Sequence, residues 1–367
     1  MNKNLYVDFH VLQTVPPSCV NRDDTGSPKM AMYGGAMRAR VSSQSWKRAM
    51  RLMFQELFTS DYIGYRTKDV LKLVSDKICE ENAEITDTDA QKVAKKVLEL
   101  AGVKAGSDKK DALFFISAKQ VQNVAKLAAA YKESSAKEKD KDKDKEYKPL
   151  LEKALNDTPS VDLLLFGRMA ASNPNLNYDA AAQVAHSIST HAVSNEYDYF
   201  TAVDDCAPED NAGAGHLGTV EFNSSTLYRY ATVNVKELAE KLQPEELKMA
   251  VKGFAEAFIR SMPTGKQNTF ANRTLPDMVY VVFRKDQPVN LAGAFERAVV
   301  SNNSGFVEES KQALMNHAKT VYQDYVSEPE QAWVVGSDSE DFAQKVNLAE
   351  LLQNIACEIG KYSEEGE

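Results

Sequence analysis

Hydrophobic and polar residues alternate at the start of the chain. The apolar positions are Leu5, Val7, Phe9 and Val11, and the residues between them are Tyr6, Asp8 and His10. A period of two predicts a β-strand with one buried face. The stretch after this strand contains Pro16, Pro17, Gly26, Pro28 and the pair Gly34 and Gly35. It is therefore expected to form an ordered but irregular loop.

A helical period follows the loop. Apolar side chains recur at Trp46, Met50, Met53, Phe54 and Leu57, which predicts a helix with Ser42 or Ser43 as its N-cap. Between residues 60 and 182 the spacing i, i+3, i+4 recurs in VLKLVSDKI, DAQKVAKKVLELAGV and AKQVQNVAKLAAAYK. This spacing predicts a helical insertion. Within it, AKEKDKDKDKE (residues 136–146) alternates in charge and predicts a solvated, flexible tip that holds no ligand.

The second half of the chain is predicted to contain most of the strands. After the helix-like YDAAAQVAHSI and the strand-like HAV, aromatic and β-branched residues flank a segment rich in Asp, Pro, Gly and Ala. This pattern predicts a long β-hairpin. STLYRYATVNV and MVYVVF predict two more strands, and Leu247, Ala250, Val251, Phe254 and Phe258 form one face of a helix between them. Helices are expected around residues 291–300, 306–327 and 339–360, with a short strand at AWVV.

Without its insertions, the predicted order of elements is β-α-β-β-α-β, the ferredoxin-like arrangement shared by RNA-recognition domains. The predicted fold class is therefore α+β. The predicted divisions are residues 1–59, the first part of the sheet domain; 60–182, the helical insertion; 183–195, a strand of the sheet domain; 196–222, the hairpin; and 223–367, the rest of the sheet domain with the C-terminal helices.

The charge of the chain is distributed unevenly. The whole chain carries −9, but residues 21–51 hold seven basic residues against two acidic ones, so this stretch is about +5 and the remainder about −14. The seven are Arg22, Lys29, Arg38, Arg40, Lys47, Arg48 and Arg51, and the two are Asp23 and Asp24. Because salt confines attraction to roughly 10 Å, a local basic groove can bind a polyanion while the remaining surface repels it.

The helix that begins near residue 42 is the first candidate site. Its N-terminus offers backbone N–H groups together with the side chains of Ser42, Ser43, Gln44 and Ser45, and such an end attracts phosphate. Lys47 and Arg51 are four residues apart and point the same way. With the basic residues of the preceding loop, they predict a track for a sugar-phosphate backbone. An ordinary solvated helix face with a solubilising loop remains the alternative.

Two further segments are candidates. The loop Gly265-Lys266-Gln267-Asn268, followed by Asn272 and Arg273, suits close approach to phosphate or ribose and can lie near the loop after the first strand. The hairpin flank Tyr197, Tyr199, Phe200 and Thr201 can stack on bases or wedge between them. Such stacking is worth about 1–3 kcal/mol per base in single-strand binders. Aromatic residues at a strand end are also common core anchors, and this alternative stays open.

No pattern of catalytic or metal-binding residues emerges. Asp23 and Asp24 are adjacent, so in an extended chain they point to opposite sides and make a poor two-metal clamp. The five-residue gap between His186 and His191 fits neither one helical face nor one strand face. The four cysteines lie far apart and are expected to be free thiols. No cofactor and no metal are predicted, and Asp23 is expected to brace Arg22.

Four blocks of sequence, in the same order, resemble the CasC backbone subunits of type I-E CRISPR Cascade. They are SCVNRDDTGSPKMAMYGGAMRARVSSQSWKRAMR, LLLFGRM, AAAQVAHSISTHAVSNEYDYFTAVDD and PTGKQNTFANRTLPD. The resemblance implies an RRM-like (ferredoxin-like) palm, a helical finger at residues 60–182 and a β-hairpin thumb at residues 196–222. It also implies that several copies polymerise along one CRISPR RNA (crRNA) beside the other Cascade subunits, and that the guide pairs with target DNA in antiviral defence.

The resemblance also implies which residues bind RNA. Carried over by position, Arg22, Lys29, Gln44, Lys47, Arg51 and the loop of Gly265, Lys266, Gln267 and Asn268 are backbone contacts. Arg38, Ser42 and Arg48 complete the predicted contacts in the same basic track. Met169 is implied to contact RNA beneath the thumb, and Phe200 with Thr201 is implied to form the wedge at a displaced base.

The resemblance implies no chemistry in the chain itself, because cleavage in type I systems belongs to a separately recruited helicase-nuclease. A metal-dependent ribonuclease that uses Asp23 or Asp24, as in some related type III backbone subunits, is the alternative function. A protein scaffold without RNA is a third. The N-terminus has no basic region followed by an apolar run, and about 20 apolar residues never occur together. A cytoplasmic protein with no membrane partner is therefore expected.

Overall fold

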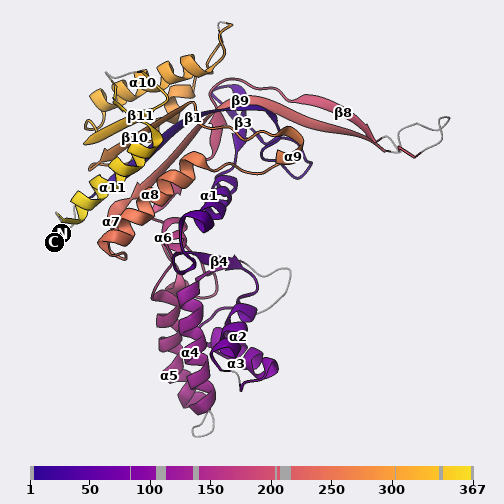
Figure 1. Cartoon of the computed structure of the whole chain (residues 1–367), viewed down its shortest axis with the longest axis vertical. Helices are drawn as coiled ribbons and strands as arrows, with labels where there is room; N and C mark the ends of the chain where they lie inside the picture. Colours follow the sequence, from indigo (N-terminus) through magenta and orange to yellow (C-terminus); the bar gives the residue numbers. More distant parts are fainter. Residues whose placement is uncertain are drawn as a thin grey trace. The chain divides into compact units, whose positions relative to one another are not determined.

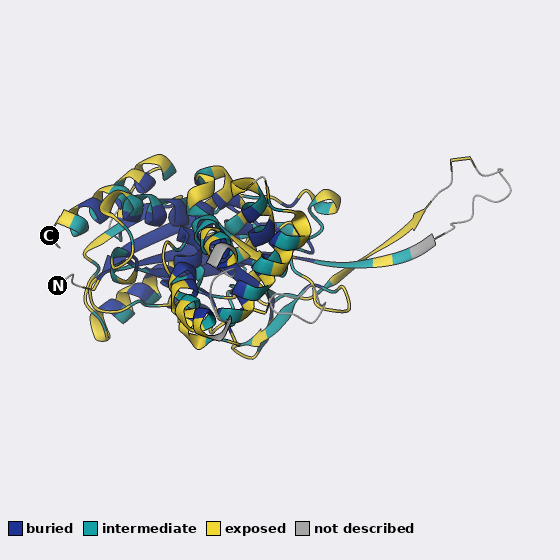
Figure 2. Cartoon of the chain, turned by 90° about the horizontal axis from the view of Figure 1, so that it is seen from below, coloured by how far each residue is buried: buried dark blue, intermediate teal, exposed yellow. Residues whose placement is uncertain are grey.

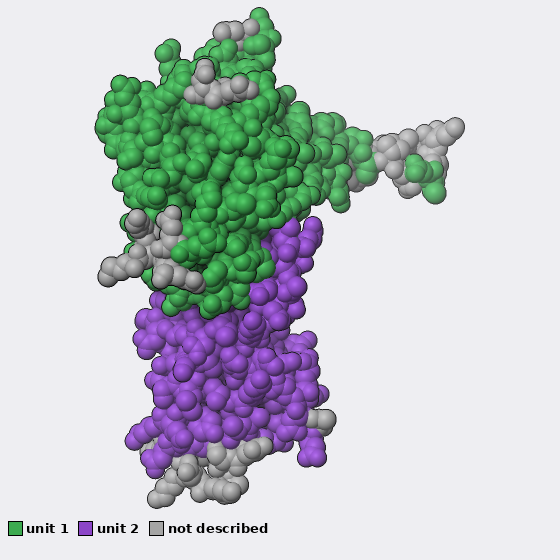
Figure 3. Space-filling model, turned by 60° about the vertical axis from the view of Figure 1, so that its left-hand side comes forward, with its two compact units in different colours: residues 1–53, 183–367 green, residues 54–182 purple. Residues whose placement is uncertain are grey.

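Figure 1 shows the computed structural model of the chain, which describes residues 4–82, 84–104, 113–134, 140–202, 205–206, 216–301, 303–338 and 342–364. The chain divides into two compact units (Figure 3), Met1–Met53 with Gln183–Glu367, and Phe54–Ala182. We call them the sheet unit and the helical unit. Helices and a mixed sheet give the α+β class that the sequence predicts. Among the described residues, no helix is both long and apolar enough to cross a membrane.

The sheet unit is built on ten strands in the order β12-β11-β10-β1-β9-β7-β3-β2, with β6 and β8 also paired to β9. The strands are β1 (Tyr6–Ser18), β2 (Met30–Tyr33), β3 (Ala36–Val41), β6 (Ala182–Val184), β7 (Ser187–Ser189), β8 (Glu196–Ala202), β9 (His216–Asn234), β10 (Met278–Arg284), β11 (Gln331–Val335) and β12 (Gln344–Lys345). β1 is antiparallel to both of its neighbours, β9 and β10. β11 and β12 are parallel, so the sheet is mixed.

Helices cover both faces of this sheet (Figure 1). They are α1 (Ser43–Leu57), α7 (Val235–Ala239), α8 (Pro244–Arg260), α9 (Gln267–Phe270), the 3-10 helix η4 (Leu291–Phe295), α10 (Val307–Asp324) and α11 (Leu348–Glu364). The apolar stripes predicted for α1 and α8 are confirmed, since Trp46, Met50, Phe254 and Phe258 are buried. The strand predicted at AWVV is also confirmed, as part of β11.

On the first face, aromatic rings join the sheet to α1 and α8. Phe9 of β1 packs against Phe254 and Phe258 of α8, with ring centroids 5.6 and 6.0 Å apart. The guanidinium carbon of Arg229 lies 3.8 Å from the ring centroid of Trp46 and 4.7 Å from that of Phe258. A buried arginine between two rings gains cation–π attraction in place of its lost hydration. This contact ties α1 and α8 to the same strand, β9.

On the second face, α10 and η4 cover residues that the sequence predicts to be exposed. Asp8 and His10 are fully buried. His10 lies among the rings of Tyr228, Tyr230 and Tyr280, and its Nδ1 is 2.9 Å from the Tyr228 hydroxyl. The prediction of a strand with one buried face is therefore wrong. Alternation in the sequence reports polar and apolar sides, whereas burial here depends on C-terminal helices that are distant in sequence.

The segment predicted as an irregular loop contains a β-hairpin formed by β2 and β3. Its turn is the pair Gly34 and Gly35, whose φ angles are +57° and +74°. Two successive residues with positive φ suit a two-residue hairpin turn. Gly34 also lies against the backbone of Glu296, because a Cβ on Gly34 would sit 1.6 Å from the Glu296 carbonyl oxygen. The sequence signal for the hairpin was the glycine pair itself.

The helix-like segment YDAAAQVAHSI instead forms β6 and β7. Hydroxyl groups bind β7 to its neighbours: the Ser189 Oγ accepts from the Ala39 N–H at 3.0 Å, and the Ser187 Oγ accepts from the Trp46 indole at 2.9 Å. Helix propensity is a weak preference that tertiary contacts override. The alanine run therefore gave a wrong helix prediction at this place.

β8 and the first part of β9 form a long hairpin. All seven residues of β8 are exposed, whereas residues 218–222 of β9 are mostly half-buried (Figure 2). Burial on β9 becomes continuous only from Ser225, where the strand enters the sheet beside β1. Residues 203–204 and 207–215, at the predicted tip, lie outside the described residues.

The helical unit packs four longer helices around its own core, with Arg168 buried among its loops. Its elements are η1 (Ser60–Tyr62), β4 (Gly64–Thr67), α2 (Val70–Glu81), α3 (Asp87–Leu100), β5 (Phe114–Ser117), α4 (Ala118–Ser134), α5 (Asp140–Asn156), α6 (Val161–Phe166) and η2 (Pro174–Leu176). The Arg168 guanidinium donates to the carbonyl groups of Phe115, Leu155 and Leu176 at 3.1, 2.9 and 2.7 Å. One buried cation thus joins three segments of the unit.

Part of the predicted charged tip belongs to α5. Residues 136–139 lie outside the described residues, but residues 140–146 are helical. The Lys143 ammonium is buried 3.7 Å from the ring centroid of Tyr131, and the Asp144 carboxylate accepts from Lys96 at 2.8 Å and from the Tyr131 hydroxyl at 2.7 Å. The prediction of a flexible tip is wrong for these residues, because tertiary partners anchor charges that the sequence pattern assigns to solvent.

Asp8 should make the stability of the sheet unit depend on pH. Its buried carboxylate accepts from the Tyr230 hydroxyl at 3.0 Å and from the Val289 N–H at 2.8 Å. Desolvation nevertheless raises the pKa of Asp8 from 3.8 to about 6. Because the pKa is higher in the folded state, we expect the free energy of unfolding to fall as pH rises from about 4 through 6, by about 3 kcal/mol.

The variant Asp8→Asn should lose most of this pH dependence, because its amide can accept from Val289 and donate to the Tyr230 oxygen. Denaturant unfolding of both proteins at about pH 4.5 and about pH 7.5 measures the difference. Equal changes in the free energy of unfolding for the two proteins would contradict the assignment to Asp8.

Candidate nucleic-acid interface

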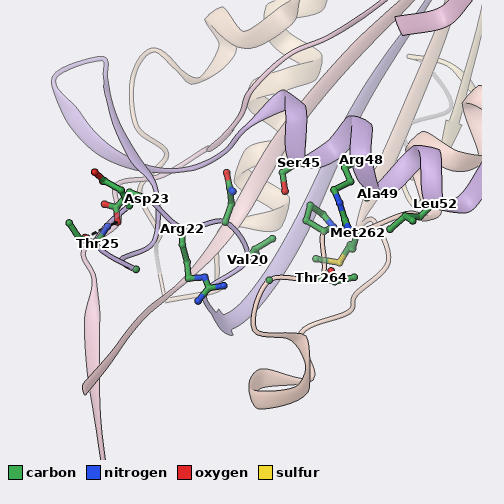
Figure 4. Close-up of a pocket in the computed structure, with 15 residues that line it drawn as sticks. Val20, Arg22, Asp23, Thr25, Ser45, Arg48, Ala49, Leu52, Met262 and Thr264 are labelled. Carbon is green, nitrogen blue, oxygen red and sulfur yellow. Dashed lines mark hydrogen bonds between the residues drawn. The ribbon is translucent and has the colours of Figure 1, made fainter. Parts of the chain in front are cut away.

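A cavity of about 540 Å³ opens where three segments of the sheet unit meet (Figure 4). It is lined by residues 20–26 after β1, by Ser45, Arg48, Ala49 and Leu52 of α1, and by residues 262–265 after α8. Arg22 and Arg48 enter it from different segments, with Asp23 and Asp24 at the same loop as Arg22. The cavity thus joins two of the predicted RNA contacts from the N-terminal track to the start of the predicted GKQN loop.

Asp23 shapes the loop that carries Arg22. Its carboxylate accepts from the Thr25 N–H at 3.0 Å, the Thr25 hydroxyl at 2.7 Å and the Ser27 N–H at 3.0 Å. These hydrogen bonds, led by the one from the Thr25 hydroxyl, lower the pKa of Asp23. The carboxylate therefore closes a tight turn, which corrects the expectation that it braces Arg22 directly.

Gly265 brings the second loop onto the first. A Cβ at this position would lie 2.0 Å from the Val20 carbonyl oxygen, so the two backbones approach as closely as only glycine allows. This approach confirms the expectation that the GKQN loop lies near the loop after the first strand. Burial raises the pKa of the Cys19 thiol here, while the positive charges of Arg22 and Lys266 oppose that rise.

The start of α1 is held by the same loop. The Ser42 N–H donates to the Asn21 Oδ1 at 2.9 Å, and the Ser42 Oγ accepts from the Ser45 N–H at 3.4 Å. Ser42 is therefore the N-cap, and it is only 6% exposed. Its hydroxyl accepts within the helix and keeps its O–H donor, so the RNA contact of Ser42 stays a prediction. Asn21, which sequence reasoning missed, links the loop to the helix; no sequence pattern marks this role.

Arg38 is a structural residue. Its side chain is 0% exposed, and its guanidinium donates to backbone carbonyl groups from three parts of the chain. The acceptors are Tyr33, Ser189, Thr190, Phe295 and Glu296. A guanidinium has only five N–H donors, so these bonds engage it fully within the protein. The structure therefore contradicts the prediction that Arg38 contacts RNA.

The remaining predicted contacts of the sheet unit lie at its surface. Gln44 and Asn268 are exposed, and Lys29, Lys47, Arg51, Lys266 and Gln267 are half-buried. On α1, the cavity is lined by Ser45, Arg48, Ala49 and Leu52, whose spacing marks one helical face. Lys47 and Arg51 flank this face instead of lining the cavity. Met169 belongs to the helical unit, where it is 82% exposed after α6.

The base of the β8–β9 hairpin is attached to both loops of the cavity. The Glu221 carboxylate accepts from the Ser27 hydroxyl at 2.9 Å and from the Asn195 amide at 3.0 Å. Phe222 packs against Phe270 of α9, with ring centroids 5.9 Å apart. Farther out, Phe200 and Thr201 are exposed on β8. The hairpin base and the cavity are therefore parts of one hydrogen-bonded and packed assembly.

Phe200 lies across the facing strand. It pairs with Gly218 of β9, and a Cβ on Gly218 would sit 2.3 Å from the Phe200 Cζ. The ring therefore occupies the space above the glycine, an arrangement in which an aromatic residue covers a strand glycine. This contact fixes the orientation of a ring that is still 41% exposed.

Comparison with known proteins gives the family. The sequence matches the family described as CT1975-like protein over residues 7–357. The chain belongs to this family. This CT1975-like protein is also similar to a chain of a CRISPR RNA-guided surveillance complex, pre-nicking, with 31% identity and a TM-score of 0.79, covering 96% of this chain and 100% of that chain.

A chain of a second CRISPR RNA-guided surveillance complex is similar as well. It shares 28% identity with a TM-score of 0.63, covering 96% of this chain and 99% of that chain. No curated protein matches the chain. Both similarities extend over nearly the whole length, so they include both the sheet unit and the helical unit of this CT1975-like protein.

Gly265→Ala tests the contact between the two loops. The added Cβ would clash with the Val20 carbonyl, so we expect the free energy of unfolding to fall by about 1–3 kcal/mol. Denaturant unfolding measures the change. Thr264→Ala in the same loop is the matched control, because Thr264 is exposed. Equal stability of Gly265→Ala and Thr264→Ala would show that the loops separate without cost.

Proposed function

We propose that this CT1975-like protein is a non-catalytic crRNA-binding backbone subunit of a type I-E Cascade complex. The observation that carries the proposal is the cavity that Arg22 and Arg48, from separate segments, both line, together with Ser45 in the first turn of α1. The similarity to chains of two CRISPR RNA-guided surveillance complexes supports RNA as the ligand and further Cascade subunits as partners.

In the proposed mechanism, the cavity binds the sugar-phosphate backbone and not the bases. The two guanidinium groups neutralise phosphate charge, and the hydroxyl groups of Ser45 and Thr264 can donate to backbone oxygens. Gly265 lets the loop that carries Thr264 lie directly against the Val20 backbone. Contacts of this kind carry little sequence information, which suits a subunit that must accept any guide.

The proposed palm is RRM-like. Along the chain, β1, β7, β9 and β10 alternate with α1 and α8, and in the sheet they stand in the antiparallel order β10-β1-β9-β7. This order supports a ferredoxin-like core. RRM domains stack bases on the face away from their two helices. Because α10 and η4 cover that face here, we propose that RNA binds at the loops instead.

The β8–β9 hairpin is proposed to act as the thumb. Copies of the chain would polymerise along one crRNA, with the hairpin of each copy over the next and Phe200 with Thr201 at a displaced base. The exposed ring of Phe200, oriented over Gly218, supports this role because a wedge must be both accessible and rigid. The guide segments between displaced bases would pair with target DNA.

The proposed subunit has no catalytic residue. Among the described residues, no group of three His, Cys, Asp or Glu side chains could hold a metal ion, and the Asp23 carboxylate already accepts three hydrogen bonds. The metal-dependent ribonuclease is thus the less supported function. Cleavage of guide-paired RNA in Mg²⁺ or Mn²⁺ that disappears in Asp23→Ala or Asp24→Ala would overturn the non-catalytic proposal.

Replacing Arg22 and Arg48 together by alanine should weaken RNA binding and its salt dependence. Each lost phosphate contact on a single strand lowers the magnitude of the slope of log K against log salt by about 0.7, so we expect a decrease of about 1.4. Fluorescence anisotropy with a labelled oligouridylate across a salt series measures the slope. Lys319→Ala, an exposed position on α10, is the control, and an unchanged slope in the double variant would count against the cavity.

Phe200→Ala should remove the regular distortion of the guide while leaving most of the affinity, because the ring contributes shape and no charge. Chemical probing of the RNA in the assembled complex reads base exposure along the guide. Gly218→Ala, whose Cβ displaces the Phe200 ring, should have the same effect, whereas Tyr199→Ala should not. Identical probing patterns for wild type and Phe200→Ala would contradict the wedge.

A further inference from the structure

A second positive cluster lies beside the cavity, formed by Lys29, Arg40 and His186. A small cavity of about 20 Å³ is lined by Lys29 and Arg40 and shares Val20 and Asn21 with the larger cavity. The cluster therefore adjoins the site of Arg22 and Arg48 across the turn at residues 20–21. Arg40 belongs to the basic track expected from the sequence but was not among the individual RNA contacts, and His186 was assigned no RNA contact.

Lys29 and Arg40 face each other across the β2–β3 hairpin. The register pairs Met30 with Ala39, and the Arg40 N–H donates to the Lys29 carbonyl at 2.9 Å, so the pairing continues by one residue. Residues directly opposite in an antiparallel pair project from the same face, with Cβ atoms about 4.5–5.5 Å apart. Like charges in this position destabilise a sheet. An anion between them would turn this repulsion into attraction.

His186 adds a hydrogen-bond donor of known direction. The Arg40 Nη1 lies 3.2 Å from the His186 Nδ1. A guanidinium can only donate, so Nδ1 accepts, and the neutral imidazole must carry its proton on Nε2. Burial and then the positive charges of Arg40 and Lys29 lower the pKa of His186, which is consistent with the neutral ring. The exposed imidazole thus presents an Nε2–H beside two cations.

The two charged groups that act on His186 are both positive. Lys29 and Arg40 are the charged groups that act on His186, and within the described part of the chain none of the three side chains forms an ion pair with a carboxylate. Three nitrogen-bearing side chains, from the loop before β2, from β3 and from the β6–β7 connection, thus lie near one another, and among the described residues none of them is paired with a carboxylate. Such a group matches the oxygens of a phosphate.

We propose that Lys29, Arg40 and His186 bind a second phosphodiester of the same RNA strand, and that this phosphate draws a proton onto His186. The proposal rests on the proposed RNA-binding function. The bound phosphate opposes the positive field of Lys29 and Arg40, so the imidazole takes up a proton from solvent at Nδ1. Arg40 then releases Nδ1 and donates to the phosphate. Binding is therefore coupled to the uptake of one proton.

This coupling predicts RNA affinity that rises as the solution becomes more acidic. If binding raises the pKa of His186 by about one unit, RNA affinity increases about tenfold as the pH falls from above the pKa of the RNA-bound protein to below the pKa of the free protein. Fluorescence anisotropy with a labelled oligouridylate at about pH 7.5 and about pH 5.5 measures this gain. We expect His186→Gln to lose most of it, because glutamine can accept from Arg40 and donate outward but does not titrate in this range.

His317→Gln is the matched control, since His317 is a half-buried histidine on α10 that the site does not include. It should show the same pH dependence as the wild type. A second readout is NMR of histidine-labelled protein, in which the titration midpoint of His186 should rise when oligouridylate is added. Lys29→Ala should lower the magnitude of the salt slope by about 0.7.

The outcomes separate this cluster from the proposed function. If His186→Gln keeps the full pH dependence, or the His186 midpoint does not move with RNA, the second phosphate site is refuted. If the Arg22 and Arg48 double variant still shows the expected decrease of about 1.4 in the slope of log K against log salt, the proposed RNA-binding function is retained. If the wild type binds no oligouridylate at either pH, both proposals are overturned.

Discussion

Strand β1 has no free side, because β9 and β10 pair with its edges while α8 covers one face and α10 with η4 the other. A shift of the β1 register by one residue would turn each side chain to the opposite face of the sheet. The apolar side chains of one face would then change places with those of the other face, which include Asp8 and His10. The register is therefore strongly specified. Since the loop at residues 20–26 continues from the end of β1, and Gly265 rests on Val20, this constraint also sets the shape of the candidate cavity.

Arginine serves two opposite purposes in the sheet unit. Arg38 and Arg229 are buried, and their guanidinium groups join segments of the protein by donating to its own acceptors. Arg22 and Arg48 line the cavity instead, where a ligand can reach them. A count of charge along the sequence gives all four residues the same weight. Burial alone separates the cations that organise the fold from those that can attract a polyanion.

Sequence patterns gave correct predictions where the local sequence of one element determines which of its residues are buried. The stripes of α1 and α8 mark faces that are buried in the structure, and the GKQN loop lies near the loop after β1 as expected. The patterns gave wrong predictions where contacts with segments distant in sequence determine burial or secondary structure. The exposed face expected for β1 is covered by C-terminal helices, and β7 forms because Ser187 and Ser189 find partners on α1 and β3. Arg40 and His186 lie 146 positions apart, so no local pattern could join them.

The complete exposure of β8 has a consequence for how this part of the chain can change over time. Its side chains add nothing to the buried core, so substitutions there are expected to alter the free energy of folding very little. The requirement for a stable fold therefore places little constraint on which substitutions β8 can accept. This strand can diverge quickly to follow a changing partner, while β1, enclosed on every side, can accept few replacements.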